Sequence, residues 1–186
     1  MKRTLVGALF FLAALSANAA EYQLDTAHTQ IFFTVSHLGF SHSTGQFIDF
    51  DGKFNFDEAD FSKGSAEVTI KTASIDLSNH EKWIGHVSSP DFFDVEKFPT
   101  MTFKSTGVTQ TGPKTMDVAG DLTIKGITKP VVLAVTFNKA GKAFGAERAG
   151  FSATTTIDRT DYGIKYGVPG VGAEVSIHIE VEGSQN

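Results

Sequence analysis

The feature that most constrains this chain is an alternation of apolar and polar residues that recurs along most of its length. Near the C-terminus, Val175, Ile177 and Ile179 alternate with Ser176 and His178. Successive side chains of a β-strand point to opposite faces, so such a segment buries one face and exposes the other. The pattern therefore predicts strands with one apolar face, and it recurs in about eight segments, which is typical of a sandwich or a barrel.

These segments determine the expected architecture. The alternation predicts strands over 22–37, 46–56, 64–72, 101–105, 116–125, 131–137, 148–158 and 174–182, with a loop over 39–45. Each strand has one apolar face, so all of them are expected to surround one interior. Closure removes exposed edges, and an eight-stranded barrel has room for side chains or one small ligand. We predict an all-β chain, an eight-stranded antiparallel barrel, in one domain over 20–186.

One long stretch, 74–105, departs from the period of two. Ser78 and Glu81 have the spacing of a capping box, and apolar residues then follow at helical intervals. Ser89 and Pro90 have the form of a second helix start, and the segment ends at Pro99 because the residue before a proline avoids the helical conformation. The stretch predicts an insert of two short helices that covers an end or a side of the barrel.

The N-terminus has the form of a secretory leader. Lys2 and Arg3 precede an apolar run over 5–15, and Ala17-Asn18-Ala19 has the small-x-small form of a cleavage site. The run is shorter than the roughly 20 residues that span a bilayer. We predict a signal peptide over 1–19, cleavage near Ala19 and a periplasmic protein.

Composition excludes several classes of function. The chain has a net charge of −5 and becomes more acidic without the leader, which argues against nucleic-acid binding. It has no cysteine, so disulfides, thiol catalysis and thiolate metal sites are excluded. Seventeen phenylalanines against one tryptophan and three tyrosines indicate a large apolar interior.

The six histidines are the main candidates for chemistry. The pairs His37–His42 and His80–His86 offer nitrogen ligands, but neither has the spacing of a helical zinc motif or an evident third ligand. A metal-assisted hydrolase that uses His37 and His86 is therefore an alternative, and the prediction is no metal and no catalytic residue. By parity His37 continues the apolar face of its strand, either at the mouth of the interior or as a hydrogen-bonded structural histidine.

Two states of the interior are compatible with this pattern. Small barrels are often filled with side chains, which would make this a structural stress protein with a solid core. Nearly every strand contributes aromatic or aliphatic residues to the lining, which favours a cavity that holds an apolar ligand.

Several motifs in order also resemble a known family. The chain resembles the YceI-like family of secreted, lipocalin-like polyisoprenoid-binding proteins over its whole predicted mature length. The matching stretches are Tyr22-x-Leu24-Asp25-x2-His28, His37-Leu38-Gly39-Phe40-Ser41, Gly45-x-Phe47-x2-Phe50-x-Gly52, His86-x2-Ser89-x-Asp91-Phe92-Phe93, Phe98-Pro99-x3-Phe103-x-Ser105, Gly120-x-Leu122-Thr123-x2-Gly126-x-Thr128-x-Pro130 and Arg159-x-Asp161-Tyr162-Gly163-Ile164.

The resemblance implies a lipocalin-like barrel that binds long isoprenoid or other lipid chains, including polyprenyl phosphates and isoprenoid quinones, for transport, storage or stress response. It implies no enzymatic activity and no cofactor other than the bound lipid. The chain departs from the family at Trp83-Ile84, where many members have an Arg-Asp pair. Any ion pair at that place is absent here.

The strand parity and the resemblance together define a predicted binding site. The expected partner is a long apolar chain, with transient membrane contact during its transfer, and both a monomer and a homodimer are compatible with the sequence. The residues predicted to contact the ligand are Phe33, Val35, His37, Ile48, Phe50, Phe54, Trp83, Phe92, Phe93, Met101, Phe103, Met116, Val118, Leu122, Phe151 and Ile177.

Overall fold

The computed structural model describes residues 19–78 and 80–185. Residues 1–18 of the predicted leader therefore lie outside the described residues. The described chain has one α-helix, α1 (Glu81–Ser88), and three 3-10 helices, η1 (Phe61–Lys63), η2 (Thr72–Ser74) and η3 (Arg159–Tyr162). No helix in this part of the chain is long and apolar enough to cross a membrane. The strands are β1 (Ala20–Leu24), β2 (Gln30–His37), β3 (Ser41–Phe47), β4 (Phe50–Phe56), β5 (Ser65–Lys71), β6 (Ile75–Asp76), β7 (Thr100–Gln110), β8 (Thr115–Ile124), β9 (Ile127–Ala143), β10 (Ala146–Asp158) and β11 (Val171–Ser184).

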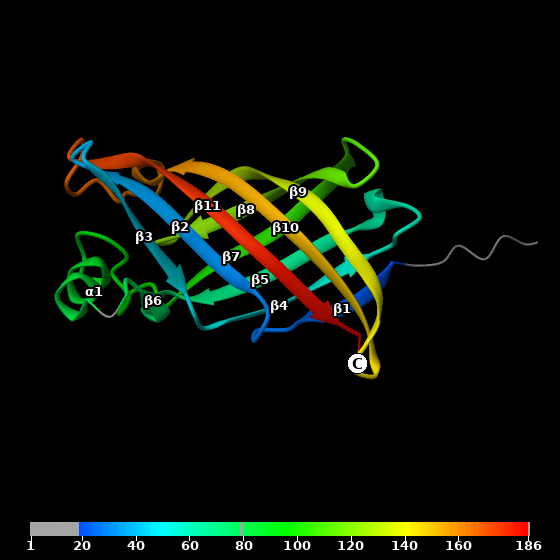
Figure 1. Cartoon of the computed structure of the whole chain (residues 1–186). Coiled ribbons are helices and arrows are strands. Elements are labelled where there is room, and N and C mark those ends of the chain that lie inside the picture. Colours follow the sequence, from blue (N-terminus) through cyan, green and yellow to red (C-terminus); the bar gives the residue numbers. More distant parts are fainter. Residues whose placement is uncertain (1–18, 79, 186) are drawn as a thin grey trace, which may run out of the picture.

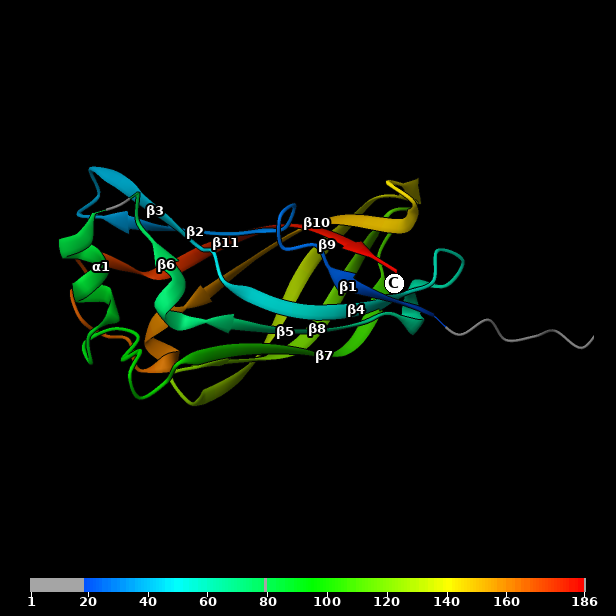
Figure 2. The ribbon, with the colours of Figure 1, turned by 90° about the horizontal axis from the view of Figure 1, so that it is seen from below.

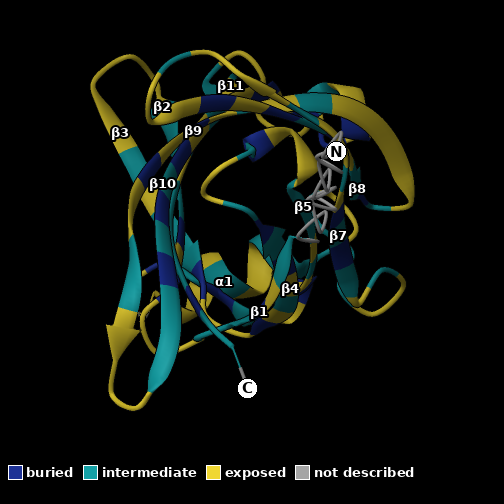
Figure 3. Cartoon of the chain, turned by 90° about the vertical axis from the view of Figure 1, so that its right-hand side faces the viewer, coloured by how far each residue is buried: buried dark blue, intermediate teal, exposed yellow. Residues whose placement is uncertain are grey.

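The strands form one closed antiparallel barrel (Figure 1). Its order is β1-β4-β5-β7-β8-β9-β10-β11, and the pairs Gln23–Ser184 and Leu24–Gly183 join β1 to β11. Farther along β11, β2 takes the place of β1 as its neighbour, and β3 pairs with β2. The eleven strand segments therefore occupy eight wall positions, and Figure 3 shows the ring from one end. The predicted eight-stranded barrel is confirmed.

Two predicted boundaries in the first half of the chain are wrong. The strand expected over 22–37 is interrupted between β1 and β2, where the Asp25 carboxylate accepts a hydrogen bond from the Ala27 N–H at 3.1 Å and caps a turn. The loop expected over 39–45 is mostly strand β3, because Leu38 and Gly39 turn the chain with φ angles of 54° and 72°. The residues of β3 are mostly small and polar and lack the apolar alternation of the other strands, so the pattern does not indicate a strand there.

The predicted register of 46–56 is also wrong in its first part. Strand β3 ends at Phe47 and β4 begins at Phe50, and the chain turns a corner between them. At the corner the Ile48 N–H donates to the Ser74 carbonyl at 3.2 Å. Phe47 is therefore buried, whereas Ile48 is 64% exposed and does not face the interior as predicted.

The predicted two-helix insert contains one helix. His80 is the N-cap of α1 without a side-chain cap bond, and Ser78 has a φ of 58°, so the expected capping box does not form. The second helix, expected from Ser89, is instead a series of turns up to residue 98. Asp94 interrupts it with a φ of 51°, and the N–H groups of this segment bond back to the carbonyls of α1 and its end. Figures 1 and 2 show α1 at the end of the barrel away from the β9–β10 hairpin.

Candidate functional site

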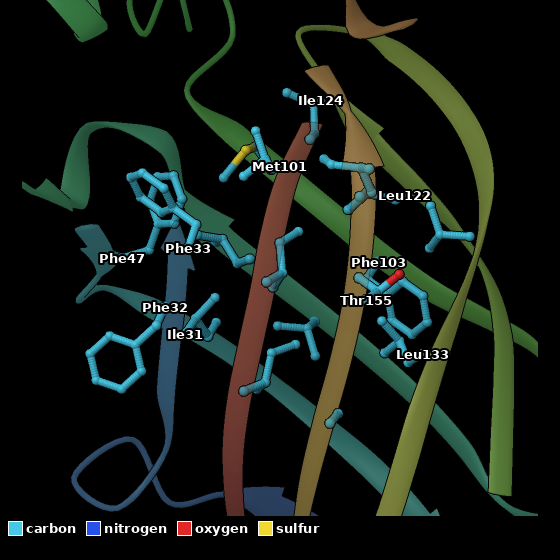
Figure 4. A pocket seen from close by; sticks show the side chains of 18 of the residues that line it. Ile31, Phe32, Phe33, Phe47, Met101, Phe103, Leu122, Ile124, Leu133 and Thr155 are labelled. Atoms are coloured by element: carbon cyan, nitrogen blue, oxygen red, sulfur yellow. The ribbon is translucent and has the colours of Figure 1, made fainter. Parts of the chain in front are cut away.

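The barrel encloses an elongated cavity of about 730 Å³. Its lining is almost entirely apolar and comes from every wall position, from α1 and from the turns that follow α1. Figure 4 shows Phe33 of β2, Met101 of β7 and Leu122 of β8 among the side chains around it. This volume lies in the range of pockets that bury a small organic ligand, so the interior is not a filled core.

Most of the predicted ligand contacts lie on the cavity wall. Those on the wall are Phe33, Val35, His37, Phe54, Trp83, Phe92, Phe93, Met101, Phe103, Met116, Val118, Leu122, Phe151 and Ile177. Phe50 is buried in the core beside the cavity and is not part of the wall, and Ile48 is exposed at the β3–β4 corner. Contact between these residues and a ligand stays a prediction.

Sequence reasoning missed three wall residues that matter. Phe47 lines the wall, whereas the two-residue period that puts Ile48 and Phe50 on the apolar face puts Phe47 on the polar face; the only signal for its burial is the spacing of three residues between Phe47 and Phe50. Phe61 lies on η1, outside any alternating segment. Arg159 follows the last strand residue of β10, is 6% exposed and lines the cavity.

One end of the cavity is closed by phenylalanines. The ring of Phe56 lies 4.9 Å from that of Phe137, 5.0 Å from that of Phe151 and 5.5 Å from that of Phe61. These separations are those of favourable edge-to-face and tilted aromatic pairs. This floor, which lies at the end away from α1, limits how deep a ligand can reach.

The other end of the cavity, its mouth, is bordered by α1, the turns after it and the 163–170 loop. His86 of α1 has its ring 4.8 Å from that of Tyr166 and 5.0 Å from that of Phe92. Trp83 lies one turn earlier on α1, 54% exposed, and its ring is 4.5 Å from that of His80. No residue of α1 is fully buried, and the helix packs on the core through the partly buried Ile84 and Val87.

Arg159 holds the loop at this mouth. Its Nε donates to the carbonyl of Gly172 at 2.8 Å, and Nη1 donates to that of Ile164 at 2.9 Å. Nη2 donates to the carbonyls of Tyr166 and Val171 at 3.0 and 2.8 Å. Burial lowers the pKa of the guanidinium, but arginine remains protonated because its ordinary pKa is far above physiological pH.

A second polar cluster lies at the seam where β1 joins β11, at the end of the barrel away from the mouth. Arg148 donates to Oδ2 of Asp25 at 2.7 Å and also pairs with Glu182, while His28 bonds the same Asp25 oxygen at 2.9 Å. The hydrogen bond from Arg148, followed by that from His28, lowers the pKa of Asp25 to about 2. This cluster ties the barrel closed.

The seam also contains the one group of metal-ligating side chains that lies close together among the described residues. Asp25, His28 and Glu182 offer ligand atoms within 4.8 Å of one another. The Arg148 guanidinium already occupies both carboxylates, and a cation there would have to displace it. His37 and His86, on which the hydrolase alternative depends, do not belong to this group.

An eight-stranded antiparallel barrel around an apolar cavity defines a lipocalin-like protein. The chain belongs to the YceI-like family, because the YceI-like domain matches residues 22–183. A UPF0312 protein of Pseudomonas putida is 45% identical over 189 residues, which cover 98% of this chain and 97% of the relative. Its name states no enzymatic activity.

Solved structures agree with the fold. The crystal structure of Burkholderia cenocepacia BcnA has a TM-score of 0.78 and 28% identity, and the match covers 86% of this chain and 98% of BcnA. A domain of Saccharophagus degradans that is described as polyisoprenoid-binding has a TM-score of 0.70. Its identity is 14%, with 89% of this chain and 98% of that domain covered, so the likeness extends to the fold alone.

Proposed function

We propose that this chain is a periplasmic binding protein that holds a long-chain isoprenoid, such as a polyprenyl phosphate or an isoprenoid quinone, or a similar lipid. The observation that carries the proposal is the apolar cavity of about 730 Å³ inside a closed barrel. Burial of an apolar chain contributes ~0.8 kcal/mol per CH2 group, so about ten groups supply enough for a micromolar complex before the cost of ordering. The cavity requires no catalytic group to bind such a ligand.

Two further observations support the class of ligand and the compartment. The Saccharophagus degradans domain with the same fold is described as polyisoprenoid-binding, which favours an isoprenoid chain over other lipids. The basic and apolar N-terminal leader with its Ala17-Asn18-Ala19 site favours export to the periplasm.

The mouth has the surface needed for exchange with a membrane. Five of the nine exposed large apolar side chains of the described residues lie at this end, namely Leu38, Phe40, Trp83, Tyr166 and Val168, while Phe144 is equally exposed at the opposite end. Phe40 is 91% exposed, an exposure that is costly in water and favourable at a lipid surface. Transient contact at this end would let a lipid pass between bilayer and cavity for transport or storage without crossing water.

The test is mass spectrometry of an organic extract of the protein purified from its native periplasm. We expect one long-chain lipid in near-stoichiometric amount. The matched variants are Leu133→Asp, which places a carboxylate on the cavity wall, and Val132→Asp, one residue away at an exposed position. The first variant should lose the lipid and the second should keep it, whereas empty wild-type extracts would contradict the proposal.

A further inference from the structure

The charge on the cavity wall is opposite in sign to that of the protein. The chain has 21 acidic and 16 basic residues, yet no aspartate or glutamate lies on the wall formed by the described residues. The titratable groups on the wall are, apart from Tyr162, all basic: His37, His42, Lys53, His80, His86 and Arg159. A purely apolar ligand would not require acidic groups to be absent from the wall while basic groups are present.

Two of these histidines lie against the segment that Arg159 holds by its hydrogen bonds. His37, the last residue of β2, pairs with Val171, whose carbonyl accepts a hydrogen bond from Arg159. His86 contacts the ring of Tyr166, whose carbonyl accepts another hydrogen bond from Arg159. The basic groups are therefore grouped at the mouth, whereas Lys53 lies apart and pairs with Glu21 at 2.8 Å.

Arg159 is a buried charge with no carboxylate of the described residues in ion-pair contact, although Asp158, its neighbour in the chain, attracts it through space. Its four hydrogen bonds all end on backbone carbonyls, and no carboxylate of the described residues lies within ion-pair distance of it. Its neighbour Asp158 is instead bonded to the N–H and hydroxyl of Thr160, at 2.8 and 2.6 Å. A guanidinium has five N–H donors, so one donor on Nη1 is left over. A role in holding the loop explains the four bonds but neither the fifth donor nor a buried guanidinium that has no carboxylate of the described residues in contact.

We propose that the mouth binds the anionic headgroup of a single-chain lipid, a phosphate or a carboxylate, with Arg159 as its countercharge. A buried cation is costly unless an anion pairs with it, and a charge-assisted bond to a guanidinium is about twice as strong as a neutral one. The ring of Phe92 lies 5.8 Å from the guanidinium and covers one side of it. The inference rests on the proposed function, since the chain below the headgroup supplies most of the affinity.

The test compares headgroups on one chain. The delipidated protein is titrated with dodecyl phosphate, dodecanoate, dodecanol and dodecylamine, below their micelle concentrations, by isothermal calorimetry. We expect both anions to bind at least tenfold more tightly than dodecanol. Dodecylamine should bind most weakly of the four. Inorganic phosphate in millimolar amounts should not compete, because it lacks the chain.

The outcomes separate this inference from the proposed function. If dodecanol or dodecylamine binds as tightly as the anions, or if inorganic phosphate displaces dodecyl phosphate, the headgroup site is refuted while lipid binding stands. If none of the four ligands binds, the proposed function itself is refuted.

A pair of variants locates the site. Arg159→Gln should reduce the preference for dodecyl phosphate over dodecanol to about threefold or less, and Lys139→Gln, at an exposed position outside the cavity, should leave it unchanged. An unchanged preference in folded Arg159→Gln protein would refute the role of Arg159. If Arg159→Gln does not fold, His86→Gln takes its place in the test and should reduce the same affinity ratio. An unchanged ratio in His86→Gln would place the headgroup away from this mouth and overturn the inference.

Discussion

Thr155→Phe tests whether the interior is open or filled. Thr155 points inward from β10 and keeps partial exposure although the wall surrounds it, so that exposure is to the cavity (Figure 4). Its hydroxyl has no hydrogen-bond partner among the described residues, and the substitution therefore breaks no bond. A phenyl ring at this position would occupy space that is now empty.

The expected effects on stability and on binding have opposite signs. Burial of a phenyl ring contributes about 1.5–3 kcal/mol relative to its exposure, so the empty protein should be as stable as wild type or more stable. The ring would displace about three CH2 groups of a bound chain, and at ~0.8 kcal/mol each this weakens binding about 50-fold. In a filled core the same substitution would instead cost about 1–3 kcal/mol through overpacking.

The assay combines urea unfolding of the delipidated protein with titration by dodecyl phosphate. Thr156→Phe is the matched control, because Thr156 lies one residue along β10 at an exposed position. Destabilisation by Thr155→Phe, with none from Thr156→Phe, would refute the open cavity. Unchanged affinity would show that the chain does not pass this part of the wall.

Three further predictions concern the two ends of the barrel. Asp25→Asn should lower the free energy of unfolding by about 2 kcal/mol at pH 7, because the pKa of Asp25 falls from 3.8 to about 2 beside Arg148. Urea unfolding at several pH values should show this difference above pH 4 and its loss as the pH falls through 2. Trp83 fluorescence should shift saturably when delipidated protein binds dodecyl phosphate and not when it meets inorganic phosphate; binding without a shift would mean that α1 does not move. Phe61→Ala should lower the free energy of unfolding by about 3–5 kcal/mol. Because it deepens the cavity at the floor, it should also shift the preferred alkyl phosphate to a longer chain, and an unchanged chain-length optimum would place the floor elsewhere.

The sequence predicted the barrel because nearly every wall segment has the same two-residue period. Val175, Ile177 and Ile179 of β11 all line the cavity, as their alternation requires. The errors lie where alternation stops being informative. At the β3–β4 corner a single skipped residue exchanged the two faces, so Ile48 was placed inside and Phe47 outside.

The mouth was harder to predict than the wall because tertiary contacts form it. The segment after Ser89 has good helix-start residues, but its N–H groups find partners on α1, which stabilises turns rather than a second helix. The burial of Arg159 depends on four carbonyls of residues 5 to 13 positions away, and no local pattern marks such a convergence. Its fixed place follows from the fold and not from its immediate neighbours.

The two ends of the cavity impose an orientation on any bound lipid. The floor consists of phenylalanine rings packed 4.9–5.9 Å from one another, and the polar wall residues next to it, Asn55 and Ser65, are already bonded to each other at 2.9 Å. Burial of an unpaired polar headgroup there would cost several kcal/mol, whereas at the mouth the headgroup meets Arg159, the histidines and water. Under the proposed function, a bound lipid therefore lies with its tail toward the floor and its headgroup at the mouth. Under the two proposals the same end of the barrel recognises the headgroup and touches the bilayer, and this end has both the buried Arg159 and the exposed Phe40 and Trp83.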